Sequence, residues 1–208
     1  MTDALSTYTH RFLPSQGDDP RTLLLLHGTG GDENDLIQLG QMLAPDAALL
    51  SPRGTVLEHG AARFFKRLAE GVFDLEDLRA RTKDLVAFVG AAAAKYGFDA
   101  TKVVAVGFSN GANIATSVLL TSPVTFSAAV LFRPMVPFVP EDRVDLSGKR
   151  VFIGAGEDDP IVPRDHPYRL AELLQLCGAD VTTVWQPGGH ALTRADVSKA
   201  YEWLEEKH

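Results

Sequence analysis

Several features that would indicate a particular compartment or partner are missing from this 208-residue sequence. A single cysteine, Cys177, excludes an intrachain disulfide. No run of about 18 apolar residues is present to cross a membrane, and residues 1–7 lack the basic start and apolar core of a signal peptide. Lys and Arg (20) are outnumbered by Asp and Glu (27), whereas nucleic-acid binding needs clustered positive charge. These absences predict a cytoplasmic protein with no membrane span and no nucleic-acid partner.

Strand-like and helix-like segments alternate along the whole chain. Hydrophobic residues make up 45% and charged residues 23%, which is ordinary for a soluble globular protein. No repeat, low-complexity tract or linker divides the sequence, so residues 1–208 are expected to form one domain. The alternation predicts an α/β fold with a mostly parallel, twisted sheet and helices on both faces. The expected strands are 8–13, 22–26, 47–50, 103–106, 128–132, 150–153 and 181–185, and the expected helices are 35–43, 75–96, 112–120, 166–176 and 194–206.

A turn centred on Ser109 carries the strongest functional signal. The apolar run 103–106 leads into a Gly-Phe-Ser-Asn-Gly pattern at residues 107–111, and a helix-like stretch follows at once. Gly107 and Gly111 have no side chains to collide where strand and helix approach each other. The strand before and the helix after distinguish a nucleophile elbow from a chance match or a capping serine. We therefore predict that Ser109 is a nucleophile.

A nucleophilic serine on such an elbow needs a histidine base and an orienting carboxylate, and both come later in the chain. Three histidines follow Ser109. His190 stands in a Gly-rich loop after the expected strand 181–185, at the strand ends where open α/β sheets carry functional groups. His166 fits a surface position near a helix start, and His208 is terminal. His190 is therefore the predicted general base.

The orienting carboxylate is expected in the acidic turn 157–159, which follows the strand-like run 150–153. Asp159 is preferred because Pro160 directly after it restricts its backbone. A restricted backbone suits a residue that holds one imidazole tautomer. Asp158 remains the alternative within this turn.

The loop after strand 22–26 reads His-Gly-Thr-Gly-Gly and is expected to place a backbone N–H beside the nucleophile. We predict that the N–H groups of Thr29 and Asn110 form the oxyanion hole. A phosphate-binding P-loop would end in Gly-Lys-Ser/Thr, and a dinucleotide motif would have glycine at Glu33, so neither pattern is met. His27 is expected to be a buried anchor of the loop.

These four motifs, in this order and at this spacing, resemble the phospholipase/carboxylesterase family of small α/β-hydrolases, which also includes the acyl-protein thioesterases. The resemblance runs nearly end to end. The segments that carry it are the oxyanion loop 26–32, the elbow 107–111, the acid turn 159–163 and the histidine loop 189–190. The segments that resemble the bacterial carboxylesterase branch are 52–54, 63–67 and 71–75. The family commonly has Gln where this chain has Asn110, and only the backbone N–H serves the oxyanion there.

The expected reaction is hydrolysis of small to medium carboxylic esters through an acyl-enzyme on Ser109. His190 moves the proton, Asp159 stabilises the imidazolium, and no metal or organic cofactor is required. The acidic residues 32, 33 and 35 lie in one helix start, so no metal site is expected there. The resemblance also suggests a homodimer.

Two apolar loops, 53–73 directly after Pro52 and the Pro-containing 133–140, are expected to border the cleft beside Ser109. Neither is long enough to form a large lid. The side chains expected to contact substrate, or else to cover the sheet edge, are Phe64, Phe65, Phe73, Met135, Val136 and Phe138. Arg133 is expected either to face an anionic group of the substrate or to pair with a carboxylate.

Three alternative functions are compatible with the same fold and motifs. An acyl-protein thioesterase or lysophospholipase uses the same groups on a different leaving group. A cofactor-free perhydrolase shares the triad and would need peroxide. A non-catalytic binding protein on a hydrolase fold would be marked by a broken triad, whereas every position is filled here. A dienelactone hydrolase is disfavoured because its nucleophile is cysteine.

Overall fold

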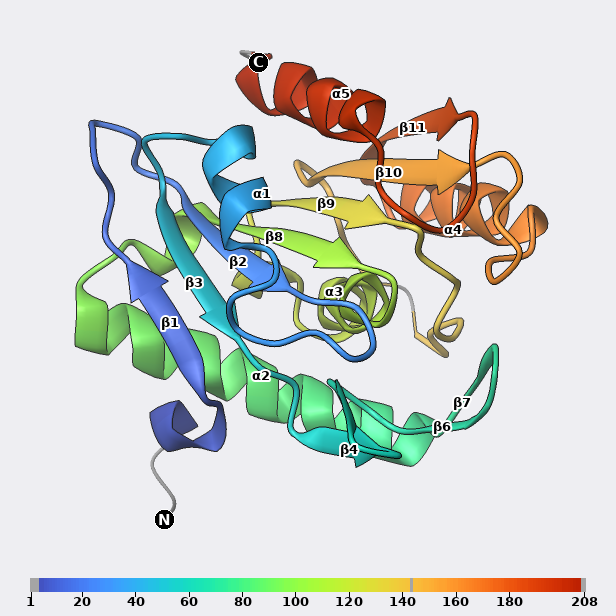
Figure 1. The fold of residues 1–208 in the computed structure, drawn as a ribbon, viewed down its shortest axis with the longest axis horizontal. Coiled ribbons are helices and arrows are strands. Elements are labelled where there is room, and N and C mark those ends of the chain that lie inside the picture. The colour runs from blue at the N-terminus through green and yellow to red at the C-terminus, as the bar shows by residue number, and fades with distance from the viewer. Residues whose placement is uncertain (1–3, 143, 207–208) are drawn as a thin grey trace.

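A seven-stranded sheet forms the centre of the computed structural model, which describes residues 4–142 and 144–206 (Figure 1). The strand order is β1-β3-β2-β8-β9-β10-β11, and all neighbours pair in parallel except β1 and β3. The strands are β1 (His10–Leu13), β2 (Thr22–Leu26), β3 (Ala48–Pro52), β8 (Val103–Phe108), β9 (Ala128–Phe132), β10 (Arg150–Gly156) and β11 (Asp180–Gln186). The mostly parallel sheet expected from the sequence is confirmed.

Helices cover both faces of the sheet, as expected (Figure 1). One face packs against α2 (Leu75–Tyr96), α3 (Asn110–Thr121) and α4 (Asp165–Leu176). The other face packs against α1 (Ile37–Leu43) and α5 (Arg194–Glu205). Three short 3-10 segments are η1 (Ala4–Thr7), η2 (Ala100–Lys102) and η3 (Pro123–Thr125).

Strand β2 shows why the sheet lies between two helical layers. All five of its residues are buried. Leu24 and Leu26 join the core under α2, α3 and α4, whereas Leu23 and Leu25 join the core under α1 and α5. Successive side chains of a strand point to opposite faces, and a strand buried on both faces is apolar throughout.

Helix α2 has the bounds expected from its sequence. The Asp74 side chain accepts a hydrogen bond from the N–H of Asp77 at the start, and Gly97 ends the helix with a φ of 76°. Asp and Asn are favoured N-caps, and glycine adopts a positive φ without steric cost. These local signals fix both ends of the longest helix.

Residues 53–73 form two small hairpins rather than the irregular loop expected. The first pairs β4 (Val56–Glu58) with β5 (Ala61–Arg63), and the second pairs β6 (Arg67–Ala69) with β7 (Val72–Phe73). Their turns contain the positive φ angles of His59, Gly60 and Gly71. In Figure 1 they project beyond β3 near the start of α2.

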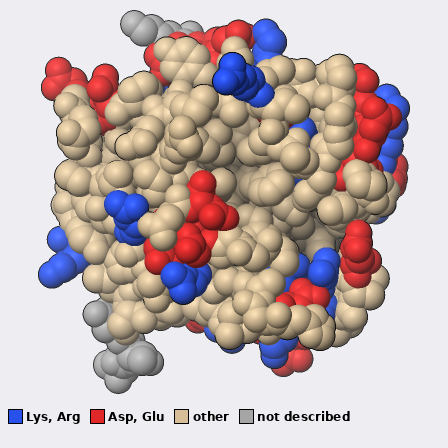
Figure 2. All heavy atoms as spheres, viewed as in Figure 1, with Lys and Arg blue, Asp and Glu red and all other residues tan. Residues whose placement is uncertain are grey.

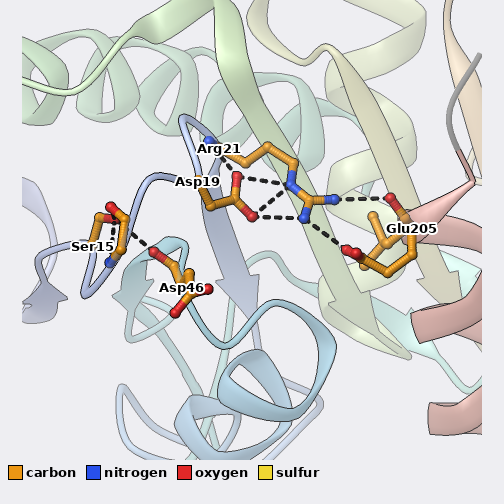
Figure 3. A network of polar contacts seen from close by, with 7 residues as sticks. Ser15, Asp19, Arg21, Asp46 and Glu205 are labelled. Carbon is orange, nitrogen blue, oxygen red and sulfur yellow. Dashed lines mark hydrogen bonds and ion pairs between the residues drawn. The ribbon is translucent and has the colours of Figure 1, made fainter.

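A polar network ties the segment before β2 to the end of α5 (Figure 3). The Arg21 guanidinium lies 2.6 Å from Asp19 and 2.9 Å from Glu205. Ser15 donates to the carbonyl oxygen of Asp46 at 2.6 Å.

On the face of the molecule shown in Figure 2, basic and acidic side chains are intermixed. Within the described residues, no helix combines the length and apolarity needed to span a membrane.

Candidate active site

The ends of three strands bring together the three residues predicted to form a catalytic triad. His190 Nε2 lies 2.9 Å from Ser109 Oγ, and His190 Nδ1 lies 2.8 Å from Asp159 Oδ2. Ser109 follows β8, Asp159 follows β10 and His190 follows β11. A nucleophile, a base in hydrogen-bond reach and a third group that orients the base are the arrangement that nucleophilic catalysis requires. Their catalytic roles stay a prediction.

The backbone at Ser109 has the geometry expected of an elbow. Its φ is 51° and its ψ is −111°, and its N–H donates to the carbonyl oxygen of Phe132 on β9. A non-glycine residue held at such a φ is strained, and strain of this kind concentrates at functional sites. A Cβ at Gly111 would collide with the carbonyl oxygen of Leu26, so glycine is required there. The turn therefore depends on close contact between α3 and β2.

Asp159 is held by its own turn. Its Oδ1 accepts hydrogen bonds from the N–H groups of Ile161 at 2.8 Å and Val162 at 3.0 Å, which leaves Oδ2 for His190. Only 2% of the Asp159 side chain is exposed. Asp158, the alternative, is exposed. The structure therefore brings Asp159 to the histidine.

The two predicted oxyanion-hole residues line the same cleft as Ser109. Asn110 is the first residue of α3, so its N–H has no acceptor within the helix. Its Oδ1 accepts from the N–H of Phe64 at 2.7 Å, and the Thr29 hydroxyl accepts from Arg63 Nη1 at 2.5 Å. Arg63 at the end of the first hairpin and Phe64 directly after it thus hold Thr29 and Asn110 in place. Their part in an oxyanion hole remains a prediction.

His27 anchors the loop that carries Thr29, as expected. It is buried, its Nδ1 donates to the carbonyl oxygen of Gly28 at 2.6 Å, and its Nε2 accepts from the N–H of Gly54 at 2.9 Å. Acceptance at Nε2 requires a neutral ring. Burial lowers the pKa of His27 below its usual value, although the bond to Gly28 opposes the shift.

The lowered pKa of His27 predicts that stability falls in mild acid. The unfolded chain binds a proton at His27 near pH 6.5, whereas the folded chain resists it. This contribution to stability is present above the unfolded pKa and is lost as pH falls toward the folded pKa. We expect the free energy of unfolding, measured with urea, to fall more steeply between pH 8 and pH 5.5 for the wild type than for His27→Gln. Because burial also lowers the pKa of His166, only the difference between the proteins reports on His27. Equal slopes would contradict the prediction.

A buried ion pair holds the loop around His190. Arg133 follows β9 with a φ of 55°, and its Nη1 and Nη2 each lie 2.9 Å from the carboxylate of Asp196 on α5. The same guanidinium donates to the carbonyl oxygens of Gly189 at 3.1 Å and Ala191 at 3.2 Å, on either side of His190. Of the two expectations for Arg133, pairing with a carboxylate is the one observed.

The carboxylate of Asp196 stays ionised in this buried position. Burial alone would raise its pKa, but hydrogen bonds from Arg133 and Thr193 hold the pKa below the usual value. Thr193 is the N-cap of α5 and forms a capping box with Asp196. The start of α5 is therefore fixed to the His190 loop.

The side chains predicted to contact substrate divide between the cleft and the interior of the protein. Phe73 and Met135 line the cleft beside Ser109. Phe64 and Phe65 are completely buried, and Phe138 lies in a separate hollow beside Leu120, so the expectation is corrected for these three. Phe64 packs 4.7 Å from the His27 ring and Phe65 packs 5.2 Å from the Phe73 ring, measured between ring centroids. Val136 is partly buried against the core.

Sequence reasoning missed several residues of this cleft. Besides the predicted residues, its lining contains Arg63, Arg67, Glu70, Gly71, Asn113 and Ile161. Asn113 accepts a hydrogen bond from the N–H of Met135 at 2.7 Å and so positions one wall. The signal was available in segment 63–67, where two arginines flank the aromatic pair.

A serine, a carboxylate and a histidine after three strands of a mostly parallel sheet, beside a glycine-rich loop, define an α/β hydrolase. The family model described as Phospholipase/Carboxylesterase matches residues 12–208, and the chain belongs to this family. Among the residues that the structure describes, the segments from 53–73 and 133–140 that border the cleft are short, and neither forms a large lid.

Similar proteins come from several bacteria. A Bacillus subtilis (strain 168) protein named "Putative hydrolase MhqD" is 47% identical over 92% of this chain and 96% of its own. The Bacillus cereus carboxylesterase structure is 47% identical, with a TM-score of 0.92 over 94% of this chain and 92% of its own. A carboxylesterase from Mesorhizobium loti is 32% identical, with a TM-score of 0.88 over 93% and 92%. The chain is thus an ester-hydrolase enzyme, and its resemblance to the bacterial carboxylesterases is confirmed.

Proposed function

We propose that this protein is a serine carboxylesterase that hydrolyses small to medium esters through an acyl-enzyme on Ser109. The observation that supports it is the continuous hydrogen-bonded chain from Asp159 through His190 to Ser109, with links of 2.8 and 2.9 Å. Thr29 and Asn110 lie in the same cleft, where their N–H groups would stabilise an oxyanion. We also propose one domain, a cytoplasmic location and a homodimer.

The residues of the site divide the steps of the reaction between them. His190 Nε2 takes the Ser109 proton as Oγ attacks the ester carbonyl, and Asp159 stabilises the imidazolium at Nδ1. The N–H groups of Thr29 and Asn110 stabilise the negative oxygen of the tetrahedral intermediate. Collapse of the intermediate expels the alcohol, which receives the proton from His190 and leaves an acyl-enzyme. Water then gives a proton to His190 as it attacks the acyl-enzyme, and collapse of this second intermediate releases the acid while His190 returns the proton to Ser109 Oγ.

Short esters are expected to be the better substrates. The cleft is walled by Phe73, Met135 and Ile161 and has no large lid that would enclose a long chain. Hydrolysis of p-nitrophenyl esters from acetate to palmitate should therefore show kcat/KM highest at short acyl chains, because methylenes beyond the cleft stay in water and forgo the about 0.8 kcal/mol that burial of each would contribute. A maximum at long chains would favour a lysophospholipase or acyl-protein thioesterase. Faster cleavage of matched thioesters would point to the thioesterase.

A further inference from the structure

Two arginines of the cleft have no task in the mechanism above. Arg63 and Arg67 line it together with Ser109, Thr29 and Asn110. Arg63 ends β5 and Arg67 begins β6, so the segment between the two hairpins carries both guanidinium groups to one wall. Arginine binds carboxylates through paired N–H groups in a fixed plane, which makes it a specific partner for anions.

The guanidinium of Arg63 is buried but only partly satisfied. Its side chain is 3% exposed. Nη1 donates to the Thr29 hydroxyl, and Nε donates to the carbonyl oxygen of Phe65 at 3.1 Å and lies 3.3 Å from Glu58. Nothing in the described part of the chain accepts a hydrogen bond from Nη2, and solvent reaches this atom, because it is not one of the fully buried polar atoms that lack a partner. Burial, and then the positive charge of Arg67, lower the pKa of Arg63. A further anion would therefore stabilise this group.

Glu58 and Glu70 together match the charge of the two arginines, but without the exposed Glu70 the charges do not cancel. Glu58 is shared, because both of its oxygens accept from Arg67 Nε, at 3.0 and 3.1 Å, while one also lies near Arg63. One carboxylate between two guanidinium groups leaves one positive charge over. Glu70 also lines the cleft, but it is exposed and belongs to the turn between β6 and β7. The wall is thus positive, and its rim carries one acidic group.

We infer that the ester substrate carries a carboxylate, which Arg63 and Arg67 bind while Ser109 attacks the ester carbonyl. Arg63 donates to Thr29, whose N–H is proposed to bind the oxyanion, so the carboxylate would lie only a few bonds from the reacting carbon. Half-esters of short dicarboxylic acids, or short esters of hydroxy acids, have this form. The inference rests on the proposed esterase function and names the substrate class.

Matched pairs of esters test the inference. Monomethyl glutarate and methyl valerate place a carboxylate or a methyl group at the acyl end, and butyryl glycolate and ethyl butyrate do the same on the alcohol side. Acid release at pH 7 gives kcat/KM for each ester. We expect the wild type to prefer the charged member of at least one pair by about tenfold or more, because charge-assisted hydrogen bonds to arginine are replaced by solvent for the neutral ester. The pair that shows the preference identifies the side that carries the carboxylate.

Variants assign the preference to residues. Arg67→Gln should lower the charged-to-neutral ratio of kcat/KM about tenfold, whereas Glu70→Gln should raise it by removing a repulsive charge. Lys102→Gln is the matched control, because it removes one positive charge from η2 at the opposite end of β8. Its ratio should equal that of the wild type. Arg67 is preferred over Arg63 for this test because Arg63 also holds Thr29.

Binding of glutarate, measured by calorimetry, decides the inference without turnover. We expect glutarate to bind wild type about tenfold more tightly than Arg67→Gln. A wild type that favours neutral esters in both pairs, or a ratio and a glutarate affinity that do not change in Arg67→Gln, would overturn the inference and leave the esterase function standing. A wild type that hydrolyses no ester would overturn the proposed function, and glutarate binding would still decide the carboxylate site.

Discussion

Replacing Ser109 with alanine is expected to lower kcat for a short p-nitrophenyl ester by about 10⁴- to 10⁶-fold, because loss of the nucleophile removes the acyl-enzyme route and leaves only the remaining groups of the site. His190 would then have no hydroxyl to deprotonate at the end of its 2.9 Å hydrogen bond. The measurement is kcat with enzyme at a concentration high enough to detect the residual rate.

The matched control for this result is Ser198→Ala, which removes a hydroxyl from the exposed side of α5. Its kcat should equal that of the wild type. Covalent labelling by a fluorophosphonate should likewise occur in the wild type and in the control but be absent from Ser109→Ala. Substantial turnover by Ser109→Ala would contradict the proposed mechanism, because a different nucleophile would then have to be at work.

The second large effect is expected at Asp196. Its replacement by alanine should lower the free energy of unfolding by about 3–5 kcal/mol, because a buried guanidinium would lose its partner. The Arg133 side chain is completely buried, so solvent does not reach its guanidinium in the folded protein. Urea unfolding measures the loss. We also expect kcat to fall, because Arg133 would no longer hold the carbonyl groups beside His190 in one position.

Asp165→Ala is the control for burial. Asp165 pairs with Arg169 one turn along α4, with both side chains more than half exposed. Exposed pairs of this spacing contribute little to stability, so the variant should unfold almost as the wild type does. If Asp196→Ala were no less stable than Asp165→Ala, the ion pair would not be what holds the His190 loop.

The sheet could be read from the sequence because its strands are continuous apolar runs that end at turn residues. Residues 22–26 and 128–132 have the bounds that the sequence indicated, and the 75–96 helix is marked by Asp74 and Gly97 at its ends. The hairpins of residues 53–73 could not be read in this way. Strands of two or three residues are too short to show an alternation of apolar and polar residues. The hairpin segment also depends on partners distant in the sequence, such as Asn110, which accepts a hydrogen bond from the N–H of Phe64.

The triad could be located because its residues follow motifs and strand ends, which are local signals. The side chains that line the cleft could not be located in this way, because the neighbours of an aromatic side chain in space decide whether it faces the cleft or the core. Phe64 is buried because the ring of His27, which precedes it by 37 residues in the sequence, lies against it. Arg63, beside it in the chain, reaches the cleft instead.

The strand order also makes catalysis a late event in folding. Ser109 and His190 are 81 residues apart, and β9 and β10 lie between their strands β8 and β11. Parallel pairing between strands this far apart in the sequence forms slowly, because the chain loses the entropy of closing the loop before the strand contacts stabilise it. The bond from His190 to Ser109 therefore requires four strands in register. A refolding chain should regain helical signal before it regains turnover, and returning activity would time the completion of the C-terminal half of the sheet.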